Sequence, residues 1–444
     1  MTFVVVALVA QGFLTAQAPV PVERVTFDEA IKRAIERNPS SAIAAAGILR
    51  AEALLTEARS AARLQVNGSI TTTTLNERVE FEGATVTPQH QVTASLDVRY
   101  PLYAPARWAR RTQAEDQRTV AQANVEEVRR QTAFATADAY LTILARRRVV
   151  AATETARDVA AAHFDLARQL EQAGTGSRLN MLRAQQEVSA DEVLVEASRL
   201  GVYRAQEALG VLLAADGPVD AIDEPTFVIP SDAASVVPGG RMGPPVVGAD
   251  PRVGPPQDGH MGPPLQEWRP DLRLFAAETR AAERVLRDSS KDRWPFLEAM
   301  FQPSSTYPAQ FFLPQNSWRF LLQLSVPIVD SGQRVGQRTE RQAALDISRA
   351  TLANAVTTAS SEVRAARESI ASAERAVASA RAGGDQARQV VEIVNISFRA
   401  GAATNIEVID AERRARDADI AAAVAEDTLR RARLELLTAL GRFP

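Results

Sequence analysis

The chain has 444 residues, of which 46% are hydrophobic and 24% are charged, and its formal net charge is −3. This balance is typical of a folded protein and gives no reason to expect binding to nucleic acid or to an anionic membrane surface. The absence of cysteine excludes disulfides, thiol nucleophiles and cysteine-bound zinc within these residues, and a cysteine-linked lipid anchor is not expected.

Residues 1–18 form an apolar run that ends in the tripeptide Ala16-Gln17-Ala18. An apolar core followed by an A-x-A step is typical of a secretory signal peptide, and a proline-rich segment follows it. A buried strand is the alternative interpretation of the same residues. No other stretch approaches the ~18 apolar residues that a membrane helix requires.

Residues 19–220 predict a first structural repeat of helices around one β-hairpin. Thr26 and Glu29 have the spacing of a capping box at the start of a short helix, which Pro39 should end. A second helix follows, and then two runs of alternating apolar and polar side chains, as in the strands of a hairpin. The later elements are expected at about 64–103 for the hairpin, about 106–170 for a long helical rod, and 179–213 for a further helix.

Residues 221–268 are rich in proline and glycine and predict a linker. A proline-rich docking segment is the alternative. The order of elements then restarts in residues 269–444 at a nearly constant offset, which indicates an internal duplication. The second repeat is expected to hold a helix at 270–290, a hairpin at about 296–329, a rod at 333–399 and a helix at 405–441.

The predicted strands have one apolar and one mainly polar face. In water, helices would cover the apolar face, whereas in a membrane every backbone polar group must be paired and the sheet must close on itself. Four strands are too few for closure, because known barrels begin at about eight strands. A membrane sheet would therefore be completed by further copies of the chain. The residues assigned to lipid are Val92, Leu96, Val98, Phe320, Leu322 and Leu324.

The second rod carries a seven-residue repeat of apolar side chains. Such a repeat is the a/d seam of a coiled coil, although a self-contained helical bundle would explain it equally well. One row consists of Leu345, Leu352, Ala359, Ala366 and Ala373, and the other of Val356, Val363, Ile370 and Val377.

Sequence motifs of enzymes are missing. His90, His163 and His260 have neither metal-ligand spacing nor a nearby nucleophile, and we interpret them as surface histidines. The GTGS at residues 174–177 is too short for a phosphate loop and fits a turn. We therefore expect no catalytic site, no metal site and no cofactor.

Taken together, these features resemble the outer membrane efflux proteins, the TolC-like channels of Gram-negative bacteria. The resemblance runs from Val25 to Gly441. It depends on the duplicated plan and on four segments of the sequence. These are NPSSAIAAAGILRAEALL with its partner RPDLRLFAAETRAAERVL, SVPIVDSGQRVGQ after a strand, and FRAGAATNIEVIDAERR at a helix turn.

The resemblance implies a mostly α-helical protein with a small β part. Three chains would form a twelve-stranded transmembrane β-barrel, four strands from each, joined to a long α-helical coiled-coil barrel. The homotrimer would sit in the outer membrane, in contact with its lipid, and span the periplasm as a passive duct of a tripartite efflux or type I secretion system. A periplasmic adaptor protein and an inner-membrane transporter would be its partners.

The resemblance also implies roles for single residues. Glu407 and Asp410 fall on the acidic motif that narrows the tunnel at its periplasmic tip, and they would act as the gate. Gly174 and Gly401 would form the tip turns where the adaptor docks. The sequence departs from the family pattern at Ala403, where some members carry a basic residue that stabilises the closed state of the tunnel tip.

Pro101 and Pro327 would mark the change from strand to tunnel helix, because proline ends a strand ladder and cannot sit within a helix.

The alternative function is a soluble periplasmic coiled-coil scaffold or adaptor. In a soluble protein of this kind, helices would cover the apolar face of the sheet, whereas in the channel that face would contact lipid. The sequence does not indicate the cargo.

Overall fold

The computed structural model describes residues 22–81, 84–229, 269–311 and 314–443. The predicted signal peptide and residues 230–268 of the predicted linker lie outside the described residues. The first half contains β1 (Glu23–Val25), α1 (Phe27–Arg37), α2 (Pro39–Ser60), β2 (Gln65–Thr74), β3 (Val79–Phe81), β4 (Ala84–Thr87), β5 (His90–Tyr103), α3 (Pro105–Gln172), α4 (Arg178–Leu212) and β6 (Val219–Ala221). The second half contains α6 (Pro270–Asp288), the 3-10 helix η2 (Ser289–Arg293), β7 (Phe296–Tyr307), β8 (Asn316–Ser325), α7 (Gln333–Arg399) and α8 (Asn405–Ala439).

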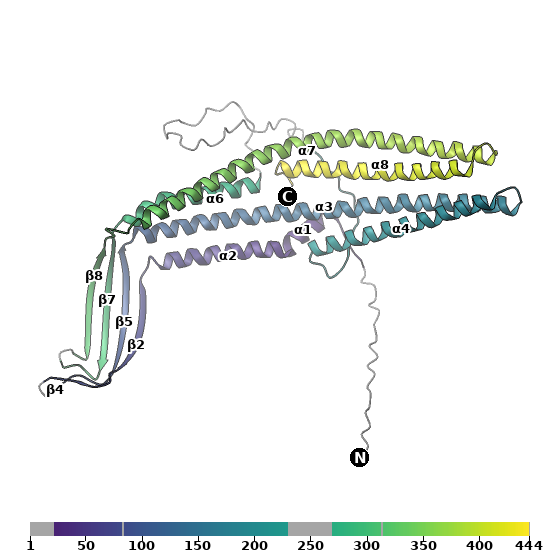
Figure 1. Ribbon diagram of the computed structural model, residues 1–444. Coiled ribbons are helices and arrows are strands. Elements are labelled where there is room, and N and C mark those ends of the chain that lie inside the picture. The colour runs from purple at the N-terminus through teal and green to yellow at the C-terminus, as the bar shows by residue number, and fades with distance from the viewer. Residues whose placement is uncertain (1–21, 82–83, 230–268, 312–313, 444) are drawn as a thin grey trace, which may run out of the picture. The chain divides into compact units, whose positions relative to one another are not determined.

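The duplicated plan is confirmed by the lengths and order of the helices. The long helices α3 and α7 have 68 and 67 residues, and the returning helices α4 and α8 have 35 each. A β-hairpin precedes the long helix in each half (Figure 1). None of the described helices combines the length and the apolar character needed to cross a membrane.

The chain divides into two compact units, and α3 and α7 each contribute residues to both. We describe each unit by itself. Unit 1 comprises Met1–Asn38, Thr132–Val228 and Glu368–Leu434, and unit 2 comprises Pro39–Gln131, Ile229–Arg367 and Glu435–Pro444.

In unit 1, the returning helices lie beside the long helices that precede them. Thr153 on α3 and Ser198 on α4 share a hydrogen bond of 3.1 Å between their hydroxyls. On the other pair, Arg388 of α7 donates to Asp419 of α8 at 3.2 Å. Seven of the nine residues predicted for the seam of α7 are buried, namely Leu345, Ala359, Val363, Ala366, Ile370, Ala373 and Val377, whereas Leu352 and Val356 are half-buried.

Unit 1 also contains a short parallel pair, β1 with β6, that the sequence did not predict. Tyr140 of α3 is fully buried beside it. Its hydroxyl donates to the Asp223 carboxylate and accepts the backbone N–H of Ile222 at 3.1 Å. Burial, followed by the hydrogen bond with Asp223, raises the pKa of Tyr140, so the phenol stays protonated and keeps this role. The β1–β6 strand pair thus connects the segment before α1 to the segment after α4.

Unit 2 contains the sheet, which is antiparallel throughout with the order β2-β5-β7-β8. The register pairs Val66 with Val98, Val98 with Phe301, and Phe301 with Phe320. Side chains of residues paired across a sheet lie on the same face. One face is therefore mainly apolar across all four strands, as the alternation predicted, with Thr72, Ser305 and Asn316 as polar exceptions.

The prediction for Pro101 requires a correction, because β5 continues through it to Tyr103. The pairing of β2 with β5 ends at Arg99, so Pro101 has a strand partner only on the β7 side. A residue without a backbone N–H is tolerated at such an open edge. The register shifts between Pro101 and Tyr103, and α3 then begins at Pro105. Pro327 lies as predicted between β8 and α7.

Ion pairs around the buried Arg269 join several helices of unit 2. Arg269, the residue before α6, is only 4% exposed. Its guanidinium donates to the Asp271 carboxylate at 2.7 Å, to Glu362 of α7 at 2.7 Å, and to the carbonyl oxygen of Ala439 at 3.2 Å. Burial disfavours the charge of Asp271, yet the hydrogen bonds and charge of Arg269 keep its pKa below the ordinary value. Arg269 therefore links α6 to α7 and to the end of α8.

Candidate functional site

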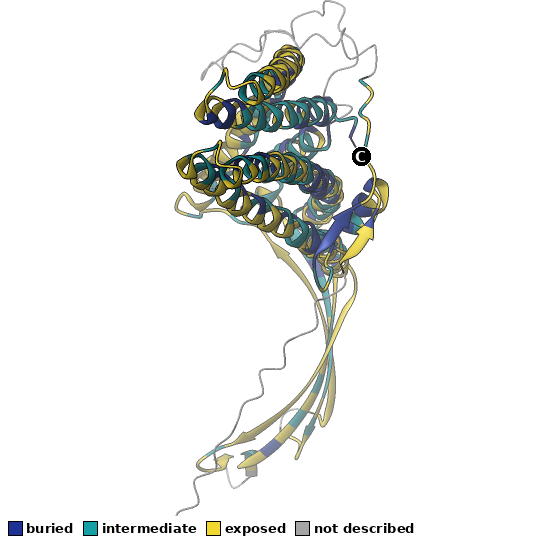
Figure 2. Ribbon diagram, turned by 90° about the vertical axis from the view of Figure 1, so that its right-hand side faces the viewer, coloured by how far each residue is buried: buried dark blue, intermediate teal, exposed yellow. Residues whose placement is uncertain are grey.

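The strands of the sheet are mostly exposed in the single chain (Figure 2), and the exposed residues include the large side chains of the apolar face. Ile70 on β2 is 78% exposed, Leu96 on β5 is 42% exposed, and Leu322 on β8 is 60% exposed. Burying large apolar side chains is the main favourable contribution to folding, so an uncovered sheet face of this kind requires an apolar environment. The six residues assigned to lipid lie on this face, as the register shows.

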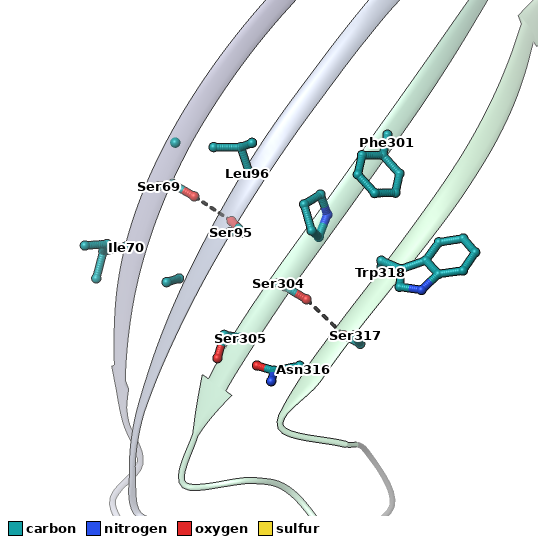
Figure 3. Close-up of a pocket in the computed structure, with 13 residues that line it drawn as sticks. Ser69, Ile70, Ser95, Leu96, Phe301, Ser304, Ser305, Asn316, Ser317 and Trp318 are labelled. Atoms are coloured by element: carbon teal, nitrogen blue, oxygen red, sulfur yellow. Dashed lines mark hydrogen bonds between the residues drawn. The ribbon is translucent and has the colours of Figure 1, made fainter.

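Small side chains leave a hollow in this apolar face. Gly68, Ala94, Pro303 and Ser305 lie along its floor, from three neighbouring strands. Larger side chains surround it, and Figure 3 shows Ile70, Leu96, Phe301 and Trp318 around the opening. Among the described residues that line it none is charged, and the exposed lining is mainly apolar, so the hollow extends the apolar surface.

The opposite face of the sheet is polar, and its side chains bond across the strands. Ser69 bonds Ser95 at 2.8 Å and Ser304 bonds Ser317 at 3.0 Å (Figure 3). Gln302 lies between charged neighbours and completes a chain of contacts over three strands. It donates to Asp97 at 2.9 Å and accepts from Arg319 at 2.9 Å. Polar groups satisfied in this way suit a face that meets water.

Both outer strands of the sheet have a free side. Within the part of the chain that the structure describes, β2 pairs only with β5, and β8 pairs only with β7. A long exposed edge presents unpaired N–H and C=O groups and is a template for pairing with another chain. The sheet is therefore open in the single chain.

The two helix turns predicted at the tips have the same backbone plan. Gly174 and Gly401 have φ angles of +76° and +75°, which favour glycine. In the first turn, the N–H groups of Thr175 and Gly176 both donate to the carbonyl of Leu170, at 3.0 and 2.8 Å. A Cβ on Gly176 would lie 2.8 Å from the backbone of the preceding helix, so this second glycine is also required. This requirement at Gly176 was not predicted from the sequence.

Glu407, one of the two predicted gate residues, has a structural role in its own helix. Its carboxylate accepts the backbone N–H of Thr404 at 2.6 Å, and the Thr404 hydroxyl accepts the N–H of Glu407 at 3.4 Å. This is a capping box at the start of α8. The bond from the Thr404 N–H lowers the pKa of Glu407, so the carboxylate stays ionised. Asp410, three residues on, is exposed and lies 4.0 Å from Arg414.

Near the turns, one buried hydrogen bond joins the two halves of the chain. His163 of α3 is 5% exposed and its Nε2 lies 2.7 Å from Oδ1 of Asn405, which is 2% exposed. The Asn405 amide in turn donates to the carbonyl of Asn180 at 3.4 Å. The prediction that His163 is a surface histidine is therefore wrong. His90 is exposed as predicted, and His260 lies outside the described residues.

A second contact between the halves lies further along α4 and α8. Arg413 of α8 donates to Glu187 of α4 at 2.8 Å, and Arg416 donates to Asp191 at 2.6 Å. Glu187 and Asp191 are 4% and 3% exposed. These pairs were not predicted from the sequence, because the partners are more than 220 residues apart and nothing local to either helix identifies them.

The chain matches the family model described as outer membrane efflux protein over residues 30–215 and 264–442. No curated protein matches its sequence. A solved structure described as a membrane protein from Pseudomonas aeruginosa is similar, with 20% identity, 93% of each chain covered and a TM-score of 0.75.

Two further solved structures are similar at lower identity. The outer membrane protein VceC of Vibrio cholerae shares 17% identity, with 94% of this chain and 96% of that chain covered and a TM-score of 0.74. The CmeC outer membrane channel of Campylobacter jejuni shares 14% identity, with 94% and 86% covered and a TM-score of 0.75. These likenesses show that the whole fold is shared.

Proposed function

Because this chain belongs to the outer membrane efflux protein family, we propose that three copies of it form a passive export channel across the outer membrane and periplasm. The observation that carries this proposal is the exposed apolar face of the sheet, with Ile70 at 78% and Leu322 at 60% exposure. Lipid is the environment that such a face requires, and the hydrogen-bonded polar face suits a water-filled lumen.

The open edges of the sheet support the trimer. In a bilayer each unpaired backbone group costs several kcal/mol, so β2 and β8 need strand partners. Copies of the same chain offer the complementary edges, β8 to β2, around a closed ring. Three copies give about twelve strands, which is within the range of closed membrane barrels.

Aromatic side chains support the same placement of the sheet. Tyr103 at the end of β5 packs against Trp108 of α3 with ring centroids 5.7 Å apart, and stacks on Trp294 at 6.4 Å. Tyrosine and tryptophan gather where a membrane meets water. In our proposal, this cluster marks the level at which the sheet passes from lipid to the periplasm.

In this proposal the channel is passive, so an inner-membrane transporter supplies the energy for export. A periplasmic adaptor connects this transporter to the helix tips of the channel. Gly174 and Gly401 form the turns that the adaptor would contact. A soluble scaffold or adaptor is not favoured, because no described part of the chain covers the apolar face.

Electrical recording tests the proposed channel. Protein purified from the outer membrane and added to a planar lipid bilayer should produce discrete, ohmic current steps. Protein that inserts without producing current would contradict a duct. Protein that never enters the bilayer would contradict the membrane assignment of the sheet.

The gate is tested by separating the charge of Glu407 from its capping bond. Glu407→Gln keeps a side-chain oxygen that can accept the Thr404 N–H, but removes the charge. Combined with Asp410→Asn, it should change the single-channel conductance and reduce block by divalent cations, because the carboxylates that would bind these cations are no longer charged. The measurement is single-channel conductance with and without divalent cations.

Glu407→Ala provides the matching comparison, because it removes both the charge and the cap. If Glu407→Ala changes the current and the Gln and Asn variants do not, capping explains the effect and the gate assignment is wrong. Unchanged currents in every variant would leave the acidic pair without a role in conduction.

A further inference from the structure

The contact between α4 and α8 in unit 1 contains two complete ion pairs. Arg413 binds Glu187, with its Nε 2.8 Å from the carboxylate, and Arg416 binds Asp191 at 2.6 Å. The two carboxylates on α4 are each more than nine-tenths buried. Each of them thus has a guanidinium from α8 as its principal partner.

Glu412 is a third carboxyl group at this contact, and both its oxygens are buried without a hydrogen-bond partner among the described residues. Arg416 follows it by four residues on α8, which is the spacing of a helical ion pair. The Arg416 guanidinium is instead directed to Asp191, and at 3.1 Å to Asp417. An ionised Glu412 would therefore be a buried charge without a partner, which is costly.

We propose that Glu412 is a proton-binding site that controls the strength of the α4–α8 contact, and that Arg416 changes partner when the proton leaves. With the helices in contact, Glu412 is a neutral carboxylic acid and Arg416 binds Asp191. When the helices separate, Glu412 reaches water and releases its proton to solvent. Its carboxylate then accepts the Arg416 guanidinium one turn away, and water solvates Asp191.

The charges around Glu412 support this assignment. Burial, and then the negative charges of Glu187 and Asp191 on α4, raise the pKa of Glu412 to about 8. Of the described residues, these two carboxylates are the charged groups that shift it. Arg413 and Arg416 are on the same helix as Glu412 and are directed at α4.

The sign of the pH effect follows from this raised pKa. The ordinary value for glutamate is 4.5, so the separated state binds the proton less tightly than the state in contact. The contribution of Glu412 to the contact is complete below about pH 4.5, is lost as the pH rises, and stays constant above about pH 8. His163 lies in the same unit, and burial lowers its pKa, so measurements above pH 6.5 avoid its titration.

Amide hydrogen exchange of the full-length protein in detergent tests the proposal, with rates corrected for the intrinsic effect of pH. Between pH 6.5 and 8.5, the protection of amides around Glu187 and Glu412 should fall on the order of 20-fold in the wild type. Glu412→Gln cannot ionise and should show no such fall. Glu412→Leu is a second non-ionisable variant with the same expected result.

The matched control is Glu392→Gln, which removes an exposed carboxylate of α7 and should behave like the wild type. A wild-type profile that is flat over this range would overturn the proposal. So would an equal fall in the wild type and both Glu412 variants, or protection already lost at pH 6.5 in both variants. The test does not depend on channel activity, so its failure would leave the proposed function unchanged.

Discussion

Arginine in place of Leu96 or Leu322 should prevent the protein from assembling in the outer membrane. Both side chains lie on the exposed apolar face, at 42% and 60% exposure. An arginine facing lipid costs about 2–4 kcal/mol at the middle of a bilayer, and a closed trimer would contain three of them. The measurement is the amount of protein in the outer membrane fraction, which should fall to near background.

Gln323→Arg is the matched control, because Gln323 neighbours Leu322 on β8 but lies on the polar face. Its cross-strand partner is Glu298, so an arginine there gains an opposite charge. Ser95→Arg, on the polar face beside Leu96, should also assemble, with the loss of one hydrogen bond to Ser69. Assembly of the Leu variants together with failure of the polar-face variants would show that the two faces are reversed.

Removing the buried guanidinium of Arg269 should destabilise unit 2 more than any surface change. Arg269→Met keeps much of the side-chain volume but removes the guanidinium that Asp271, with a side chain only 15% exposed, binds at 2.7 Å. Breaking a buried ion pair in this way typically costs about 3–5 kcal/mol. The variant should show a clearly lower unfolding temperature than the wild type, measured by circular dichroism in the same detergent.

Arg375→Met is the corresponding surface control. Its side chain is 69% exposed and pairs with Glu368 at 3.2 Å. Exposed pairs contribute about 0–1 kcal/mol, so its unfolding temperature should stay close to that of the wild type. Equal effects of the two substitutions would show that the ion pairs around Arg269 are not a structural link.

The elements that the sequence predicted well are those with a local signal. The Thr26 hydroxyl accepts the N–H of Glu29 at the start of α1, as the capping pattern indicated. Strand alternation predicted the faces of the sheet, because a period of two fixes which side chains share a face. The seven-residue repeat likewise predicted the buried row of α7, because residues with that spacing lie along one face of a helix.

The features that the sequence did not predict depend on contacts between distant segments. The β1–β6 pair, the His163–Asn405 bond and the Arg413–Glu187 pair each join residues at least 190 positions apart. Three-residue strands have too few side chains to show a periodic pattern. The capping box at the start of α8 could have been predicted, since Thr404 and Glu407 have the same spacing as Thr26 and Glu29.

The account depends most on a sheet whose two free edges are closed by neighbouring copies. The direct measurement is the protein mass of the purified complex in detergent, by light scattering with the detergent contribution subtracted. We predict three copies of the chain in one particle that requires detergent to remain in solution. A single chain that stays dissolved without detergent would contradict the account.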